Sequence, residues 1–262
     1  MSGKVAHLAD RAVLALHGSE VRGFLQDLLT NDIERLSPAA PLWAALLSAQ
    51  GKPLADMVVF DSGDGGVWLD VAADAAVGLV RKFTMYTLRR DVKVAMTDLR
   101  VFAGWGAAQT ASSDPRLAAL GARWIGQDTE INAEPAAYDA HRLALGVPDS
   151  ADLLIDGMMW LEANAAELNG VSFGKGCYVG QENTARMHHR DRLRKRLIPV
   201  SFSGDSGDGI IRSGVKEAGV LRTQRDGVGM AYLRLEFIER NAPLVMNGGV
   251  VTVRWPDYLP AL

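Results

Sequence analysis

One segment constrains this chain more than any other. Phe173–Arg186 reads F-G-K-G-C-Y-V-G-Q-E-N-T-A-R and contains the only cysteine of the chain, Cys177. Its three glycines permit positive φ values and a close approach of the backbone to a ligand or to another segment. We therefore expect a tight polar loop here, and we place the functional centre of the chain in it. The glycines are Gly174, Gly176 and Gly180.

The residues around Cys177 favour a reactive thiolate. Helix-forming residues begin at Gln181, so we expect a helix N-terminus just after the cysteine, and Lys175 adds a positive charge. Both features should lower the pKa of Cys177. The alternative is a buried cysteine that acts as a small apolar filler, since free cysteines are among the most buried residue types. Polar neighbours such as Gln181 and Glu182 are costly to bury unpaired and favour the reactive interpretation.

The same segment resembles the signature of the YgfZ family, folate-binding relatives of the glycine-cleavage T-protein that are implicated in iron–sulfur cluster assembly and repair. Further family-like segments occur along nearly the whole chain. The matching positions in the segment are Lys175, Gly176, Cys177, Tyr178, Gly180, Gln181, Glu182 and Arg186.

This resemblance implies a tetrahydrofolate-binding accessory protein for the assembly or repair of iron–sulfur clusters in client enzymes. Its expected partners are folate and iron–sulfur proteins or their assembly machinery. In this interpretation Cys177 is the reactive thiol and Lys175 activates it. Gln181 or Glu182 would orient the neighbouring groups.

A single cysteine limits the chemistry open to this chain of 262 residues, whose net charge is −3. It excludes an internal disulfide and a self-contained cluster held by four cysteines, and we expect no resident metal site. The N-terminus lacks the apolar core of a signal peptide, and no run approaches the roughly 18 apolar residues that span a bilayer. We therefore expect a cytoplasmic protein with no membrane partner.

Hydrophobic periodicity predicts an α+β pattern in the N-terminal region. Arg11–His17 should form a strand. A helix should follow, because apolar residues recur from Val21 to Leu29 at i, i+3, i+4, i+7 and i+8. The apolar runs Leu42–Ser48 and Leu54–Phe60 flank a turn and predict a hairpin. Further strands are expected at 67–71, 92–96 and 99–105, and further helices at 74–90 and 136–145.

Short, closely spaced strands separated by glycine turns predict a small barrel at the C-terminus. We expect these strands at 197–202, 219–223, 227–235, 244–246 and 250–255. The expected fold is therefore α+β and T-protein-like. Two N-terminal lobes would occupy residues 1–195, a C-terminal β-barrel would occupy residues 196–262, and a central pocket would lie between them.

Tetrahydrofolate or a one-carbon derivative is the cofactor that the resemblance implies. One carboxylate, Asp56, and one arginine, Arg142, suit the pterin ring and the anionic tail of such a ligand. The alternative for Asp56 is a solvated residue on an edge strand, and for Arg142 an exposed arginine among acids. Further cofactor contacts are expected from Asn31, Gly176, Tyr178 and Arg186.

A folate-dependent methyl- or aminomethyl-transferase is one alternative function. Such an enzyme needs a positioned acid or base, for which Asp56 and Glu182 are the candidates. Two alanines count against it. Where the corresponding T-protein segment looks like a paired Asp-Asp, this chain has Ala55-Asp56. Where T-proteins have a folate-contacting glutamate, this chain has Ala144.

An RNA-binding module is the second alternative, and it would use the basic run Arg186–Arg196. Such a run is usually a solvated face, and this one lacks interleaved aromatic residues, so nucleic acid is the least favoured partner. We expect its basic residues to serve a protein partner or the acidic stretch Glu130–Gly170. The adjacent His188 and His189 would point to different sides of a helix and make a poor metal pair.

Overall fold

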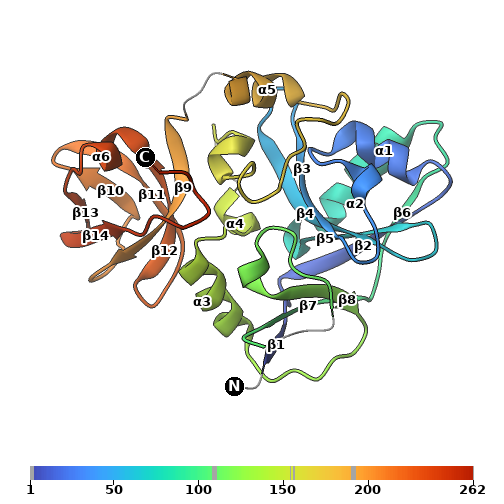
Figure 1. The fold of residues 1–262 in the computed structure, drawn as a ribbon, viewed down its shortest axis with the longest axis horizontal. Coiled ribbons are helices and arrows are strands. Elements are labelled where there is room, and N and C mark those ends of the chain that lie inside the picture. The colour runs from blue at the N-terminus through green and yellow to red at the C-terminus, as the bar shows by residue number, and fades with distance from the viewer. Residues whose placement is uncertain (1–2, 108–110, 154, 156, 190–192, 262) are drawn as a thin grey trace.

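The computed structural model describes residues 3–107, 111–153, 155, 157–189 and 193–261. Its strands form two open sheets and one closed barrel, and all strand pairs among the described residues are antiparallel. Figure 1 shows the barrel at one end of the molecule and the larger sheet at the other, with short helices between them. None of the described helices is long and apolar enough to cross a membrane.

The larger open sheet carries the first part of the chain. Its strands are β2 (Arg11–His17), β3 (Leu42–Leu47), β4 (Pro53–Asp61), β5 (Val67–Ala72) and β6 (Lys93–Met96), in the order β3-β4-β5-β2-β6. Helices α1 (Val21–Leu28) and α2 (Ala73–Thr87) pack on one face of this sheet. The buried residues of α1 repeat at the helical spacing that the sequence predicted: Val21, Phe24, Leu25 and Leu28.

The smaller open sheet has three strands, β1 (Lys4–His7), β7 (Arg100–Trp105) and β8 (Ala122–Gly126), in the order β1-β7-β8. Helix α3 (Pro135–Leu145) packs against it through Tyr138. Proline in the first turn and Gly146 at the C-cap, with φ 71°, set the ends of this helix.

A connecting region links the larger sheet to the barrel. It contains α4 (Ser150–Leu153), η3 (Trp160–Ala163) and α5 (Gln181–His189), while η1 (Ile33–Arg35) and η2 (Ala118–Leu120) lie earlier in the chain. Trp43 of β3 packs on Trp160 with ring centroids 4.7 Å apart. The same core includes Leu197 and Tyr232, which belong to strands of the barrel. One continuous apolar core therefore fixes the larger sheet relative to the barrel.

The barrel closes the C-terminal part of the chain. Its strands are β9 (Lys195–Phe202), β10 (Ile210–Ser213), β11 (Lys216–Arg225), β12 (Val228–Arg234), β13 (Leu244–Met246) and β14 (Gly249–Val253), in the order β10-β11-β12-β9-β14-β13. Helix α6 (Leu235–Glu239) contributes Phe237 to the barrel core. Closure leaves no strand edge open to pair with another chain.

The α+β class, the antiparallel hairpin and the C-terminal barrel that the sequence predicted are confirmed. The hairpin is β3–β4, and the helices expected at 74–90 and 136–145 are α2 and α3. The sequence analysis missed β1, β8, β10 and α6. Each of these elements has only four or five residues, which is too short for a hydrophobic period to stand out.

A buried carboxylate joins the two open sheets. Asp70 of β5 is fully buried and accepts hydrogen bonds from Arg11 Nε and Arg123 Nε, each at 2.6 Å. Arg11 lies on β2 of the same sheet, whereas Arg123 lies on β8 of the smaller sheet. Both arginines are buried as well, so the carboxylate and the two guanidinium groups compensate one another away from water.

This ionic network continues beneath the smaller sheet. Asp114 pairs with Arg116 at 2.7 Å and lies 3.8 Å from Arg123. Burial by itself would raise the pKa of Asp114, but these two arginines outweigh burial and lower it. Arg116 also donates to the hydroxyl of Tyr138, 3.0 Å away, which ties α3 to the network.

Replacing Asp70 with Asn should lower the free energy of unfolding by about 3 to 5 kcal/mol, because two buried guanidinium groups lose their counter-ion. Urea denaturation followed by circular dichroism measures this change. The matched control is Asp128→Asn: the Asp128 side chain is 94% exposed, 3.8 Å from Arg100, and should contribute little. Equal stability of wild type and Asp70→Asn would contradict the prediction.

Candidate functional site

Cys177 is exposed on the loop that precedes α5. This exposure excludes the alternative of a buried apolar filler. The loop also exposes two large apolar side chains, since Phe173 is 43% and Val179 38% exposed. The helix N-terminus that the sequence predicted after the cysteine is present, because α5 begins at Gln181. The reactivity of the thiol stays a prediction.

Lys175 has a different role from the one that we expected. Its ammonium group donates to three backbone carbonyls, those of Gln26 and Leu29 at 2.7 Å and that of Asn31 at 2.8 Å. Carbonyls at the end of a helix lack partners within the helix, and Lys175 satisfies those of α1. All three of its N–H groups are thus used to anchor the loop, rather than to activate Cys177. Burial lowers the pKa of Lys175 to about 8.

Gly180 holds the loop against the β3–β4 hairpin. Its φ is 82°, and a Cβ added there would lie 2.3 Å from the carbonyl oxygen of Ser48. Only glycine fits both conditions. Gly174 and Gly176 do not have positive φ values, and a Cβ at either position would meet open space. Our expectation of positive φ is therefore correct for Gly180 and wrong for the other two glycines.

The first turn of α5 folds back on the loop. Gln181 Oε1 accepts a hydrogen bond from the backbone N–H of Tyr178 at 3.2 Å, and the ring of Tyr178 lies 5.1 Å from Lys175 Nζ. Glu182 instead pairs with Arg186 at 2.6 Å, and both side chains are about half exposed or more. The structure thus brings Lys175, Tyr178 and Gln181 together, while Glu182 faces solvent.

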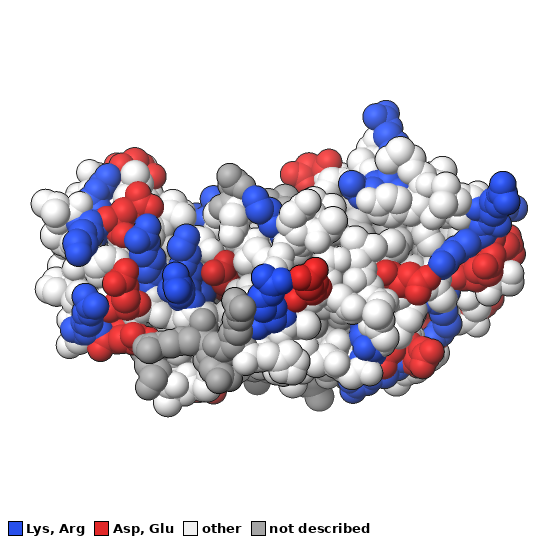
Figure 2. Space-filling view, turned by 90° about the horizontal axis from the view of Figure 1, so that it is seen from above, with Lys and Arg blue, Asp and Glu red and all other residues white. Residues whose placement is uncertain are grey.

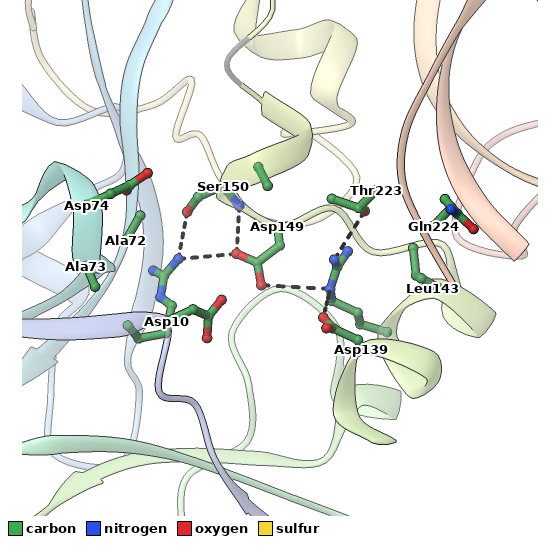
Figure 3. A pocket seen from close by; sticks show the side chains of 13 residues that line it. Asp10, Ala72, Ala73, Asp74, Asp139, Leu143, Asp149, Ser150, Thr223 and Gln224 are labelled. Atoms are coloured by element: carbon green, nitrogen blue, oxygen red, sulfur yellow. Dashed lines mark hydrogen bonds and ion pairs between the residues drawn. The ribbon is translucent and has the colours of Figure 1, made fainter. Parts of the chain in front are cut away.

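A separate pocket of about 710 Å³ lies where the two open sheets, the connecting region and the barrel meet (Figure 3). Its walls come from residues 10–11 at the start of β2, 72–74 at the start of α2, 139, 142 and 143 of α3, 149–151 at the start of α4, and 223–224 of β11. Its volume falls in the range of small-molecule sites.

Asp149 is the central ionic group of this pocket. Its carboxylate, labelled in Figure 3, lies 3.2 Å from the guanidinium group of Arg11 and 3.8 Å from that of Arg142. Burial by itself would raise the pKa of Asp149, but Arg11 and Arg142 outweigh burial and hold it well below the ordinary value. Asp149 therefore stays ionised at neutral pH and fixes both arginines.

Arg142 is the one residue among our six expected folate contacts that lines this pocket. It is 3% exposed, so the alternative of an exposed arginine is wrong. Its guanidinium already pairs with Asp139 and Asp152, each at 3.0 Å, and donates to the hydroxyl of Thr223 at 3.2 Å. These carboxylates leave Arg142 little capacity for a further anion.

Asp56 lies behind the pocket wall and is only 6% exposed, so its interpretation as a solvated edge residue is wrong. Its carboxylate accepts hydrogen bonds from Trp43 Nε1 at 3.0 Å and from the hydroxyl of Ser150 at 2.5 Å. Ser150 also accepts from Arg11 at 2.6 Å. Asp56 therefore orients Ser150, which lines the pocket.

Asn31 also makes structural contacts. Its side-chain amide donates to the carbonyls of Trp43 at 2.8 Å and Asn169 at 2.7 Å, and its oxygen accepts from the N–H of Asp32. These bonds tie the end of α1 to the larger sheet. Neither Asn31 nor the loop residues Gly176, Tyr178 and Arg186 line the pocket.

Several residues of the site were missed by the sequence analysis. Asp149 and Ser150 follow Pro148 and open α4, a helix-start signal that could have been recognised. Arg222 and Arg225 flank the pocket-lining part of β11, and the Nε atom of each is buried with no hydrogen-bond partner in the described part of the chain. Nothing in the local sequence marks these two arginines.

The basic run Arg186–Arg196 is only partly described by the structure. Arg190 and Arg192 lie outside the described residues. Arg196 pairs with Glu167 at 2.6 Å, so the expected partner in the acidic stretch is confirmed for this residue. Figure 2 shows basic and acidic side chains interspersed over this face of the molecule.

His188 stacks on Phe173 with ring centroids 3.7 Å apart. No group of three or more potential metal ligands occurs among the described residues.

Comparison with known structures and families defines the class of this protein. The glycine cleavage system aminomethyltransferase T from Bartonella henselae aligns over 98% of this chain and 86% of its own, with a TM-score of 0.75 and 12% sequence identity. Residues 194–261 match the family "CAF17, C-terminal beta-barrel domain". The chain therefore has an aminomethyltransferase T-like fold with a CAF17-type barrel.

Sequence relatives define the family. The human protein named "Iron-sulfur cluster assembly factor IBA57, mitochondrial" is 34% identical over 302 residues, covering 97% of this chain and 85% of that protein. The mouse protein of the same name is 30% identical, covering 97% and 84%. This chain belongs to the IBA57 family. The resemblance to YgfZ indicated a closely related group, and the comparisons refine it to IBA57.

The cytoplasmic location that we expected is contradicted by these relatives. The human and mouse proteins, and a third relative from Mycosarcoma maydis with 32% identity, are all named as mitochondrial. The comparison points to mitochondria rather than to the cytoplasm. Our expectation rested on the first residues of the chain, whose composition did not carry this information.

Replacing Gly180 with Ala should lower the free energy of unfolding by about 1 to 3 kcal/mol, because the new Cβ meets Ser48 and φ is positive. Gly174→Ala is the matched control in the same loop, and its Cβ would enter open space. Thermal unfolding followed by circular dichroism compares the two variants. Equal midpoints would contradict the assigned role of Gly180.

Proposed function

We propose that this protein assists the assembly or repair of iron–sulfur clusters and that Cys177 binds the cluster during this process. The observation that carries the proposal is one exposed cysteine on a loop that is anchored to α1 and to the β3–β4 hairpin. The names of the human and mouse relatives support the same role.

A partner must supply most of the cluster ligands. Protein-bound clusters are commonly held by four cysteines, whereas this chain has one. The described residues also contain no group of three potential ligands that could complete a site. Cys177 would therefore join a cluster that is already held by thiolates of an iron–sulfur protein or of the assembly machinery.

Replacing Cys177 with Ala should abolish the support of a cluster-dependent enzyme in cells and leave the unfolding midpoint unchanged, since the thiol is exposed. Native protein should react with iodoacetamide without prior unfolding. Alkylated wild type provides the matched chemical control, because it retains the fold and loses only the free thiol. Full support by the variant, or labelling only after denaturation, would refute the role of Cys177.

We also propose that tetrahydrofolate or a one-carbon derivative binds in the pocket. The volume of about 710 Å³ suits such a ligand. Asp139 and Asp149 offer carboxylate oxygens to N–H donors such as those of a pterin. The unpartnered Nε atoms of Arg222 and Arg225 lie beside pocket-lining residues and suit an anionic tail better than Arg142 does. Bound folate would supply a carrier for one-carbon groups.

Contacts with two lining residues place these arginines at the pocket rim. Arg222 donates to the carbonyl of Ala151 at 3.0 Å, and Arg225 lies 3.6 Å from Asp139. Each therefore retains a charge next to the pocket, although part of its hydrogen-bonding capacity is used. The basic groups that remain available to a ligand therefore lie on the barrel rather than on α3.

Arg222→Met and Arg225→Met should each weaken tetrahydrofolate binding about tenfold, because each removes a charge-assisted hydrogen bond to the tail. Calorimetry measures the affinity of each variant for tetrahydrofolate. Tetrahydrobiopterin serves as a second ligand: it lacks the glutamate tail, so its binding should not change. Arg212→Met is the control, since Arg212 is on the same barrel but contacts Asp208 and Ile210, neither of which lines the pocket. Unchanged folate binding would exclude the two arginines, and no binding by wild type would refute the folate proposal.

The geometry does not favour an aminomethyl transferase. Asp56 and Glu182, the two acid–base candidates, lie in different places and neither lines the pocket. Both oxygens of Asp56 are used by Trp43 and Ser150, while the side chain of Glu182 is 82% exposed on α5. No acid or base from our candidates is therefore presented to a ligand in the pocket.

A further inference from the structure

A groove of about 690 Å³ runs along α1. One wall is formed by α1 residues spaced along a single face, Glu20, Phe24, Asp27 and Leu28, and the other by residues 86–90 at the end of α2. Phe24 and Leu28 are almost fully buried and make the inner surface apolar. No residue of this groove belongs to the folate pocket described above.

Leu88 is the most unusual residue of the groove. Its side chain is 88% exposed, and its backbone has φ 49° and ψ −103°, a conformation that is unfavourable for any residue with a Cβ. Two neighbours extend the apolar surface, since Met85 is 65% and Tyr86 39% exposed. Single exposed apolar residues are common, but three close together at the rim of an apolar groove are typical of an interaction surface.

The groove adjoins the cysteine loop. The backbone N–H of Val179 donates to the carbonyl of Asp27 at 3.2 Å, and Asp27 also lines the groove. Lys175 binds the carbonyls of Gln26 and Leu29 in the same turn. The last turn of α1 therefore borders the groove on one side and supports the cysteine loop on the other.

The groove is lined by two acidic and two basic side chains, and their contacts leave one basic group available to a partner. Asp27 pairs with Arg90 at 2.5 Å, so those two charges compensate each other. The carboxylate of Glu20 accepts the backbone N–H of Asp91 at 2.6 Å. Arg89 is exposed and forms no ion pair with another described residue, and Lys82 lies one turn before Tyr86 on α2. A complementary surface would be apolar with a carboxylate placed to face Arg89.

We propose that the protein that brings the cluster to Cys177 docks in this groove, inserting an apolar side chain next to a carboxylate that pairs with Arg89. The inference rests on the proposed role of Cys177. A stable interface covers about 800 Å² on each partner, much more than one loop offers. A partner whose cluster reaches Cys177 must therefore extend over the neighbouring surface, and the groove is the apolar hollow there. The exposed Phe173 and Val179 of the loop continue the same contact surface.

The single cysteine makes a site-specific experiment available. A bifunctional maleimide added to cells that express the full chain links Cys177 only to a thiol of a bound partner, which mass spectrometry then identifies. We expect a cysteine-containing iron–sulfur protein. Leu88→Gly should reduce the crosslink yield at least tenfold. It should not reduce stability, because glycine relieves the strained φ. Arg89→Glu should reduce the yield severalfold through charge reversal.

Val215→Gly is the matched control, since Val215 is 99% exposed at the β10–β11 turn of the barrel and should leave the yield unchanged. If Leu88→Gly gives the same crosslink yield as wild type, the partner does not dock in the groove, while the proposed role of Cys177 is unaffected. Absence of any crosslinked iron–sulfur protein from wild type would overturn both. Two further assays test other occupants of the groove. If Leu88→Gly alone loses flotation with phosphatidylcholine–cardiolipin vesicles, the groove binds a membrane. If it alone loses self-association in sedimentation, the groove binds a second copy, and either result would overturn this proposal.

Discussion

The pocket depends on one buried carboxylate. Asp70 binds Arg11 and Arg123, and in doing so fixes the larger sheet relative to the smaller one. The same Arg11 then reaches Asp149 and Ser150 at the start of α4. Because buried charges must be compensated, none of these groups can move independently. The ionic network under the two sheets therefore extends without interruption into the wall of the pocket.

The larger sheet positions both candidate sites, the pocket and the cysteine loop. Strand β4 carries Asp56, which orients Ser150 in the pocket wall, and the turn before it receives Gly180 of the cysteine loop. Helix α1, which packs on the same sheet, receives Lys175. The pocket and the cysteine loop are thus separate sites on one rigid support.

The anchoring of the loop bears on our proposal that Cys177 binds a cluster held by another protein. Three hydrogen bonds from Lys175 and the close contact of Gly180 fix the backbone before any partner arrives. A pre-ordered loop loses little conformational entropy on association, so more of the contact energy is available for binding. Exposure of Cys177 then leaves the thiol accessible on an otherwise well-supported surface.

The sequence by itself determined the α+β class, the β3–β4 hairpin, the barrel and the exposed position of Cys177, because periodicity, glycine turns and polar flanks are local properties. Only the tertiary structure decided which charges meet. Lys175 is two residues from Cys177 in sequence, yet its three donors satisfy carbonyls near residues 26–31. Arg142 was expected to be free for folate, but Asp139 and Asp152 neutralise it. Such pairings are set by packing between distant segments, which no local pattern encodes.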